Sequence, residues 1–346
     1  MNASSFPSFS NATSSPHAPT FSELLALVLL FIKIILNSVG FLLNCLLLWL
    51  IIQNIRKLHT TFSILLTYTL VNDILISTTL LLCLKRIVQC HETVAMVYFG
   101  PCSLVSPEFC HVLDSIHLHA LQNWILSQIL LIGFRTAMLS SVQSFLSVKK
   151  TVSFCILAWL PGGVTLVLHI MYTFSPDRLL ALIHRCYDED FSHSVVSGYE
   201  SFYNSPMPFT LVMLLVPNIP HYFFVYCFRH KQNHDLKRRT MSVTTLRMHS
   251  TLRKVSTMKA FLPLFLLADV LIFFFCQMEL LPPQFMEYFL GTISSSINIL
   301  NPIIAICCFR PYRSMFKEYY RFIISKLSAH PKVVFLDGSS DEIVNL

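Results

Sequence analysis

The sequence predicts an all-α membrane protein, a bundle of seven transmembrane helices followed by a C-terminal amphipathic helix on the membrane surface. Three observations support this fold class: the composition, seven long apolar stretches and an uneven distribution of Lys and Arg. Of the 346 residues, 54% are hydrophobic and only 12% are charged, whereas soluble domains carry about 25% charged residues. A soluble fold of this composition would expose adhesive apolar patches. The composition therefore excludes a soluble enzyme, a disordered protein and a nucleic-acid-binding factor.

Seven stretches meet the length of about 20 mostly apolar residues that a helix needs to cross a bilayer. They are residues 24–52, 62–84, 110–134, 152–174, 209–228, 260–281 and 285–309. The third stretch is the most polar, and we keep it because of the residues that flank it. The apolar runs do not alternate with polar residues, which argues against a β-barrel. No internal repeat supports a transporter built from repeats.

The distribution of Lys and Arg predicts the orientation of the bundle. With the N-terminus outside, the inner segments hold 20 of these residues and the outer segments hold four. Residues 1–23 then form an extracellular segment, 24–309 the helical domain and 328–346 a cytoplasmic tail. Asn2 and Asn11 each begin an Asn-X-Ser/Thr triplet in the outer segment, so both are candidate glycosylation sites. No cleavable signal peptide is evident, since the first apolar stretch is too long for a signal core.

After the seventh span, residues 310–327 have an apolar side and a basic side at helical spacing. Met315, Phe316 and Tyr320 belong to the apolar side, and Arg313 and Lys317 to the basic side. Such a helix lies along a membrane surface. Membrane lipid is therefore an expected partner of this segment.

Four cysteines lie in predicted outer segments, where the environment is oxidising: Cys90, Cys102, Cys110 and Cys186. An even number in that compartment predicts two disulfides, with three possible pairings. We favour Cys110 with Cys186, and Cys90 with Cys102. Cys110 stands 25 residues before Arg135, about 37 Å of helix, so these two residues mark the outer and inner ends of the third span.

Four polar residues fall at a similar depth in the first, second and seventh spans: Asn44, Asp73, Asn298 and Asn301. Polar side chains at such depth usually face the interior of the bundle. They are expected to form a buried cluster that either holds a small cation or joins the helices by hydrogen bonds. Asp269 in the sixth span is placed to join it.

One face of the third span is the candidate lining of an outward-opening ligand pocket. Its residues follow helical spacing, and acidic residues at the outer ends of the sixth and seventh spans complete the set: Asp114, His117, Leu121, Trp124, Glu279 and Glu287. The alternative for each histidine is a packing role. His117 and His119 are two residues apart and point to different faces of a helix, so no metal site is expected.

Local motifs resemble those of the rhodopsin-like G-protein-coupled receptors. Gly-Phe-Leu-Leu-Asn44 resembles the first-helix Asn motif, Asp73 the second-helix Asp, and Asn301-Pro302 the seventh-helix Asn-Pro motif. Arg135 matches the third-helix Arg that faces the G protein in that family. Gly133-Phe134 precede this Arg without an acidic residue, and Ala305 replaces the usual Tyr, which indicates a divergent branch.

The sequence is more similar to the nematode serpentine chemoreceptors of class delta, the Srd family. The landmarks of the resemblance are Tyr98-Phe-Gly-Pro-Cys102, Cys110, Phe134-Arg135, Asn301-Pro302 and Arg310-Pro-Tyr-Arg313. It implies a chemosensory receptor, active in sensory transduction or olfaction, in the plasma membrane of a neuron or a sensory cilium. The implied partners are a small-molecule ligand outside and a heterotrimeric G protein inside.

Two other classes of function are compared with the receptor. A ligand-gated channel or small-solute transporter would need polar lining through the whole bilayer, and only the buried polar cluster suggests it. A membrane hydrolase would need a converging nucleophile, base or metal ligands, and the sequence offers no such set. We therefore expect neither enzymatic activity nor a cofactor, and the sequence leaves dimerisation open.

Overall fold

The computed structural model describes residues 21–53, 60–139, 147–172, 174–187, 191, 194–238, 254–255, 257–282, 287 and 289–308, with isolated later positions. The glycosylation candidates Asn2 and Asn11 lie outside the described residues, as do most of the predicted surface helix 310–327 and the tail 328–346. The fold class is confirmed as a bundle of long membrane helices, and the C-terminal amphipathic helix stays a prediction.

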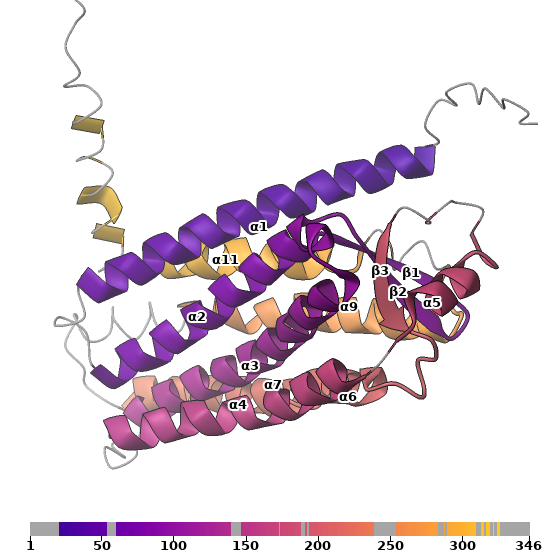
Figure 1. The fold of residues 1–346 in the computed structure, drawn as a ribbon. Helices are drawn as coiled ribbons and strands as arrows, with labels where there is room; N and C mark the ends of the chain where they lie inside the picture. The colour runs from indigo at the N-terminus through magenta and orange to yellow at the C-terminus, as the bar shows by residue number, and fades with distance from the viewer. Residues whose placement is uncertain are drawn as a thin grey trace, which may run out of the picture.

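The helices run along one common direction, with their ends gathered at two opposite faces of the bundle (Figure 1). In chain order they are α1 (Phe21–Gln53), α2 (Thr60–Cys83), α3 (Pro107–Leu139), α4 (Val148–Met171), α6 (Met207–Leu215) with α7 (Asn218–Arg238), α9 (Leu262–Gln277) and α11 (Thr292–Cys308). Five described helical segments are long and apolar enough to cross a membrane, and α11 is a shorter apolar helix.

The third span is the most polar of the seven predicted spans, and it is the central helix of the bundle. α3 packs against α2, α4, α6 and α7. Its polar residues are buried: Asp114 is 2% exposed and Asn123 is fully covered. Neighbouring protein rather than lipid surrounds these side chains, which explains how a membrane helix carries them.

A proline divides the fifth span, and a glycine precedes the helix of the seventh span. The fifth span divides into α6 and α7 because Pro217 has no backbone N–H and interrupts the helical hydrogen bonds. The seventh span begins at Thr292, seven residues later than expected from hydropathy. Gly291 precedes it with φ +77°, a left-handed conformation that favours glycine.

A three-stranded antiparallel sheet, which the sequence analysis did not predict, covers one end of the bundle. Its strands are β1 (Lys85–Cys90), β2 (Thr93–Tyr98) and β3 (Val195–Tyr199), in the order β1-β2-β3. Figure 1 shows the sheet beside the short helix α5 (Pro176–Ile183). We call the sheet, α5 and their connecting loops the lid, and this end of the bundle the lid end.

Side chains of the lid alternate between two apolar clusters, as the period of two residues in a strand requires. Val94, Met96 and Tyr98 pack with Phe273 and other residues of the helices. Ala95 and Val97 point the other way and pack against α5. The sheet is therefore a layer between the helices and α5, buried on both faces.

Two disulfides hold the lid, and their pairing corrects our expectation. The bonds join Cys90 to Cys186 and Cys102 to Cys110, rather than Cys110 to Cys186 and Cys90 to Cys102. Cys90 ends β1 at the hairpin turn and Cys102 follows the end of β2, so about 20 Å of strand separates them. Cys102 stands just before α3 and instead reaches Cys110 in its first turns.

Candidate ligand-binding site

A cavity of about 110 Å³ lies between the lid and the helices. Side chains from β1 and β2 form its roof, including Ile87, Val94 and Met96. Residues of α1, α2, α3, α6, α9 and α11 form the walls, and half of them are Leu, Val or Phe. An apolar chamber with a few polar groups is the usual form of a small-molecule site.

Two of the predicted ligand residues, His117 and Leu121, line this cavity. His117 is 6% exposed, and its Nδ1 lies 3.3 Å from the hydroxyl oxygen of Thr79 on α2. One ring nitrogen of His117 thus has a partner in the neighbouring helix, while the ring borders the cavity. Trp124 lies one turn beyond Leu121 along α3, and it is fully buried in the apolar core with Ile125.

Asp114 acts on the cavity through Lys85 rather than by lining it. Lys85 lines the cavity, and its ammonium forms an ion pair with the buried Asp114 carboxylate. The pair joins β1 to α3, so it fixes the edge of the sheet over the helices. It also neutralises the positive charge of Lys85 inside a largely apolar chamber.

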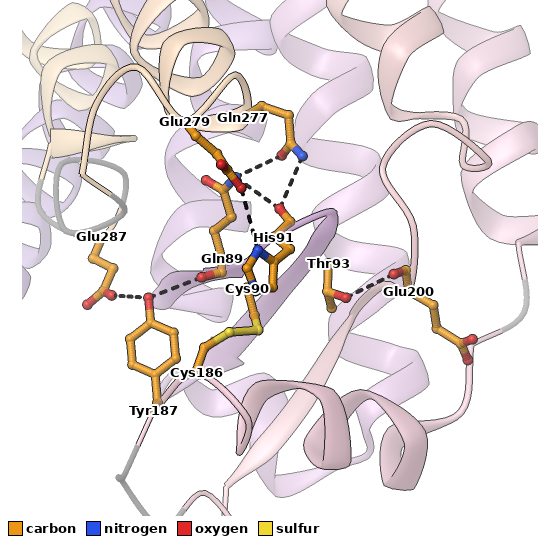
Figure 2. Close-up of a disulfide and its surroundings, with 10 residues drawn as sticks. All are labelled: Gln89, Cys90, His91, Thr93, Cys186, Tyr187, Glu200, Gln277, Glu279 and Glu287. Atoms are coloured by element: carbon orange, nitrogen blue, oxygen red, sulfur yellow. Dashed lines mark hydrogen bonds and ion pairs between the residues drawn. A yellow bond between two sulfur atoms is a disulfide. The ribbon is translucent and has the colours of Figure 1, made fainter.

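The two glutamates predicted for the ligand site lie between α9 and α11 and contact the lid. The Glu287 carboxylate accepts a 2.9 Å hydrogen bond from Arg86 Nε and a 2.8 Å hydrogen bond from the Tyr187 hydroxyl. Burial and the neighbouring Glu287 raise the pKa of Tyr187, so its hydroxyl stays a donor. Glu279 is exposed, and its Oε1 lies 3.5 Å from Nδ1 of His91. Figure 2 shows both glutamates around the Cys90–Cys186 disulfide.

A pair of glutamines fastens the hairpin to the end of α9. Gln89 Nε2 donates to Gln277 Oε1 at 3.3 Å and to the Cys276 carbonyl at 3.2 Å. Gln277 Nε2 in turn donates to the carbonyl of His91 at 3.3 Å. In Figure 2 these side chains converge above the disulfide. Movement of the end of α9 would therefore pull on the lid.

Buried hydrogen bonds attach β3 to α4 and α6. His169 Nδ1 lies 2.5 Å from the Tyr199 hydroxyl, and its Nε2 lies 2.7 Å from the Thr210 hydroxyl. The hydroxyls of Tyr98 and Ser197 lie 2.8 Å apart. Burial raises the pKa of Tyr98 and Tyr199 well above the usual value, so both phenols stay neutral.

Two charged residues of the cavity, Lys33 and Asp269, were absent from the predicted ligand set. Lys33 lies within the first apolar span, and a lysine at such depth is itself a signal of function. Asp269 on α9 accepts hydrogen bonds from the backbone N–H groups of Gly291 and Ser294, at 3.2 and 3.1 Å. The carboxylate thus satisfies donors at the start of α11, where negative charge is favourable.

The four predicted polar residues form two hydrogen-bonded pairs between α1, α2 and α11. Asn301 Nδ2 donates to Asp73 Oδ2 at 2.5 Å, and Asn44 Nδ2 donates to the Asn298 carbonyl at 3.1 Å. Asn298 Nδ2 continues the network to Asn37, which lines the cavity. Hydrogen bonds therefore connect the Asn44–Asn298 pair to the wall of the cavity.

Arg135 lies near the C-terminal end of α3, four residues before Leu139. Its side chain lies outside the described residues. Eighteen residues separate it from His117, about 27 Å along the helix. α3 thus runs from the cavity to the opposite end of the bundle.

Comparisons with known proteins agree with this architecture. The model of the serpentine type 7TM GPCR chemoreceptor family Srd matches residues 29–318. Serpentine receptor class delta-3 of Caenorhabditis elegans is 26% identical over 332 residues, which cover 92% of each chain. Serpentine receptor class delta-1 of the same organism is 24% identical over 305 residues, covering 85% of this chain and 80% of the relative.

Proposed function

This chain belongs to the Srd family of serpentine seven-transmembrane chemoreceptors, and from that membership we propose that it binds a small molecule from outside the cell and activates a heterotrimeric G protein. It is a multi-pass membrane protein of a receptor family. The observation that carries the proposed ligand binding is the apolar cavity beneath the lid, bordered by His117 and Leu121.

In this proposal the predicted ligand residues divide into three roles. His117 and Leu121 contact the ligand. Asp114 positions Lys85 at the roof, and Trp124 supports the wall from the core. Glu279 and Glu287 contact the lid from the segment between α9 and α11, and Glu287 positions Arg86 and Tyr187.

The ligand shifts the receptor between two arrangements only if it binds one of them more tightly. The walls of the cavity include residues of α9 and α11, and the lid is fastened to the end of α9 and to Glu287. A ligand that fills the cavity therefore favours one position of these helices. We propose that their movement opens a cleft near Arg135 for the G protein.

We also propose that the lid end faces the outside at the plasma membrane, possible sites being the neuronal surface and the sensory cilium. The uneven distribution of Lys and Arg supports this orientation. The two disulfides at the lid end support it as well, because disulfides persist in oxidising compartments. Enzymatic removal of glycans from Asn2 and Asn11 on intact cells tests the orientation directly.

The test of function is ligand-stimulated nucleotide exchange in membranes that contain the receptor and a G protein. A panel of volatile and water-soluble small molecules is screened, and responses are compared with those of Arg135→Ala. We expect this variant to lose exchange while it keeps ligand binding. Arg178→Ala, on α5 at the lid end, is the matched control and should couple normally.

Exchange that proceeds without ligand, or that Arg135→Ala leaves unchanged across the panel, would contradict the proposal. Ligand-gated current through a lipid bilayer that contains only this protein would instead support the alternative function, a ligand-gated channel.

A further inference from the structure

Two opposite charges face the cavity without a direct bond between them. Lys33 enters from α1 and Asp269 from α9, and both line the chamber. The two groups attract each other electrostatically, yet no ion pair between them forms in the described part of the chain. A cation and an anion that are not bonded to each other therefore both line the cavity.

One oxygen of Asp269 is available to a ligand. Oδ2 accepts the hydrogen bonds from Gly291 and Ser294 at the start of α11. Oδ1 is buried and has no hydrogen-bond partner among the described residues. A buried acceptor without a partner is costly, so a ligand that donates a proton to it gains affinity.

The ammonium of Lys33 is likewise available. Its backbone carbonyl accepts a 2.8 Å hydrogen bond from Asn37, but within the described chain its Nζ makes no hydrogen bond or ion pair. An ammonium carries three donors and no acceptor. Lys33 therefore offers donors to the same space into which Asp269 offers an acceptor.

The other charges near the cavity are already paired. Lys85 and Asp114 form an ion pair at the roof. Lys33 and Asp269 balance each other, so the chamber as a whole is neutral. A charged ligand would bring an uncompensated charge into a mostly apolar site, which is unfavourable. A neutral group that accepts one hydrogen bond and donates another satisfies both Lys33 and Asp269.

We propose that the cavity selects a small uncharged molecule with an apolar body and one hydroxyl group, which accepts a hydrogen bond from Lys33 and donates one to Asp269. This inference rests on the proposed function and names the chemical class of its ligand. The cavity volume of about 110 Å³ sets the size of the body. A cavity of about 150 Å³ holds one benzene ring, so a body of about six carbons suits this chamber.

The experiment measures binding to the full-length receptor in lipid nanodiscs, with four probes of similar size and different head groups. They are 2-hexanol, 2-hexanone, 2-aminohexane and hexanoate. 2-Hexanone has the same skeleton as 2-hexanol but lacks the donor, and the other two probes carry a charge. Binding stabilises the folded receptor, so affinity is obtained from the concentration dependence of the thermal unfolding midpoint.

We expect 2-hexanol to bind about 10-fold to 100-fold more tightly than 2-hexanone, the range for one hydrogen bond to a charged group. Both charged probes should bind more weakly than 2-hexanol. Equal binding of alcohol and ketone, tighter binding of either charged probe, or no binding of 2-hexanol up to its solubility would overturn the proposal.

Two variants test separately the two partners proposed for the hydroxyl group of the ligand. Asp269→Asn keeps an oxygen for the N–H groups of α11 but replaces the free acceptor by an amide donor, so the preference for alcohol over ketone should disappear. Lys33→Met should weaken alcohol and ketone alike by about 10-fold. Lys149→Met, an exposed change at the start of α4, is the control and should alter neither. Unchanged head-group preference in a folded Asp269→Asn receptor would contradict the assigned role.

Binding and nucleotide exchange are scored separately, so the two proposals can fail independently. Ligand-stimulated exchange without selectivity for the hydroxyl overturns the ligand class and leaves the receptor function standing. Selective binding of 2-hexanol without any exchange supports the ligand class and overturns the G-protein step.

Discussion

Arg86 and Glu287 are 201 positions apart in the chain and form an ion pair, with 2.9 Å between Nη2 and Oε2. Arg86 belongs to β1 of the lid, and Glu287 precedes α11. The Glu287 side chain is only 3% exposed, so water screens this ion pair only in part. The pair fixes the lid relative to the helices that form the walls of the cavity.

Glu287→Gln should lower the free energy of unfolding by about 1–3 kcal/mol, because the half-buried Arg86 loses a charged acceptor. The thermal unfolding midpoint in nanodiscs measures the effect. Glu279→Gln is the matched control: Glu279 also lies at the lid end, but its side chain is 73% exposed, so little change is expected. Equal losses in the two variants would show that the ion pair has no special role.

The buried phenols of the lid predict a loss of stability in alkaline solution. Burial raises the pKa of Tyr98, Tyr187 and Tyr199 above the usual value of 10. The folded state thus holds these protons more tightly than the unfolded state. Stability is complete below about pH 10 and falls as the pH rises further, because the unfolded phenols ionise first.

Unfolding midpoints between pH 8 and pH 11 measure this alkaline decline. Tyr187→Phe should show a shallower decline, since it removes one of the three phenols. It should also be less stable at pH 8, because the hydrogen bond to Glu287 is lost. A variant whose pH curve runs parallel to that of the natural chain would argue against Tyr187 as a source of the decline.

Gly40 allows α1 to approach α11 closely. A Cβ at this position would lie 2.8 Å from Asn298 Cβ and 3.0 Å from its backbone. Gly40→Ala should therefore destabilise the bundle by about 1–3 kcal/mol, as overpacking does. Gly163→Ala in α4 is the control: its Cβ would meet no atom within 4 Å. The control should be neutral or stabilising, since alanine favours helix.

The spans could be predicted from sequence because each depends on its own composition. The depth of Asp73 and Asn301 followed from those spans, and the structure brings these two residues together. The lid could not be found in this way. Its strand Thr93–Tyr98 is rich in β-branched and aromatic residues, but pairing with β3 joins segments about 100 residues apart, which hydropathy does not register.

The same limit explains why some residues predicted for the ligand site do not line the cavity. Glu279 and Glu287 were placed by depth alone, whereas the partners of Glu287 come from β1 and from the loop after α5. Asp114 was expected at the ligand, but a lysine from the unpredicted sheet pairs with it. Lys33 was visible as a charge in an apolar span, and only the packed structure shows that it faces the cavity with Asp269.

The disulfides provide the last prediction. Peptide mapping under non-reducing conditions should recover Cys90 linked to Cys186 and Cys102 linked to Cys110. The two bonds close loops of very different length, with sequence separations of 96 and 8 residues. In the chain-entropy description, the longer loop gives the larger stabilisation, about 4.7 kcal/mol against about 2.5 kcal/mol.

Replacing both cysteines of one bond by serine separates their contributions without leaving a free thiol. The Cys90→Ser and Cys186→Ser double variant should lose more stability than the Cys102→Ser and Cys110→Ser variant. The difference will be smaller than the chain-entropy value, because α3 and α4 lie within the longer loop and membrane helices keep their structure after the bundle separates. Cys227→Ser, at a free cysteine of α7, is the control and should change little. A greater loss from the shorter loop would mean that Cys102–Cys110 stabilises the start of α3 through native contacts, and the entropic explanation would then be wrong.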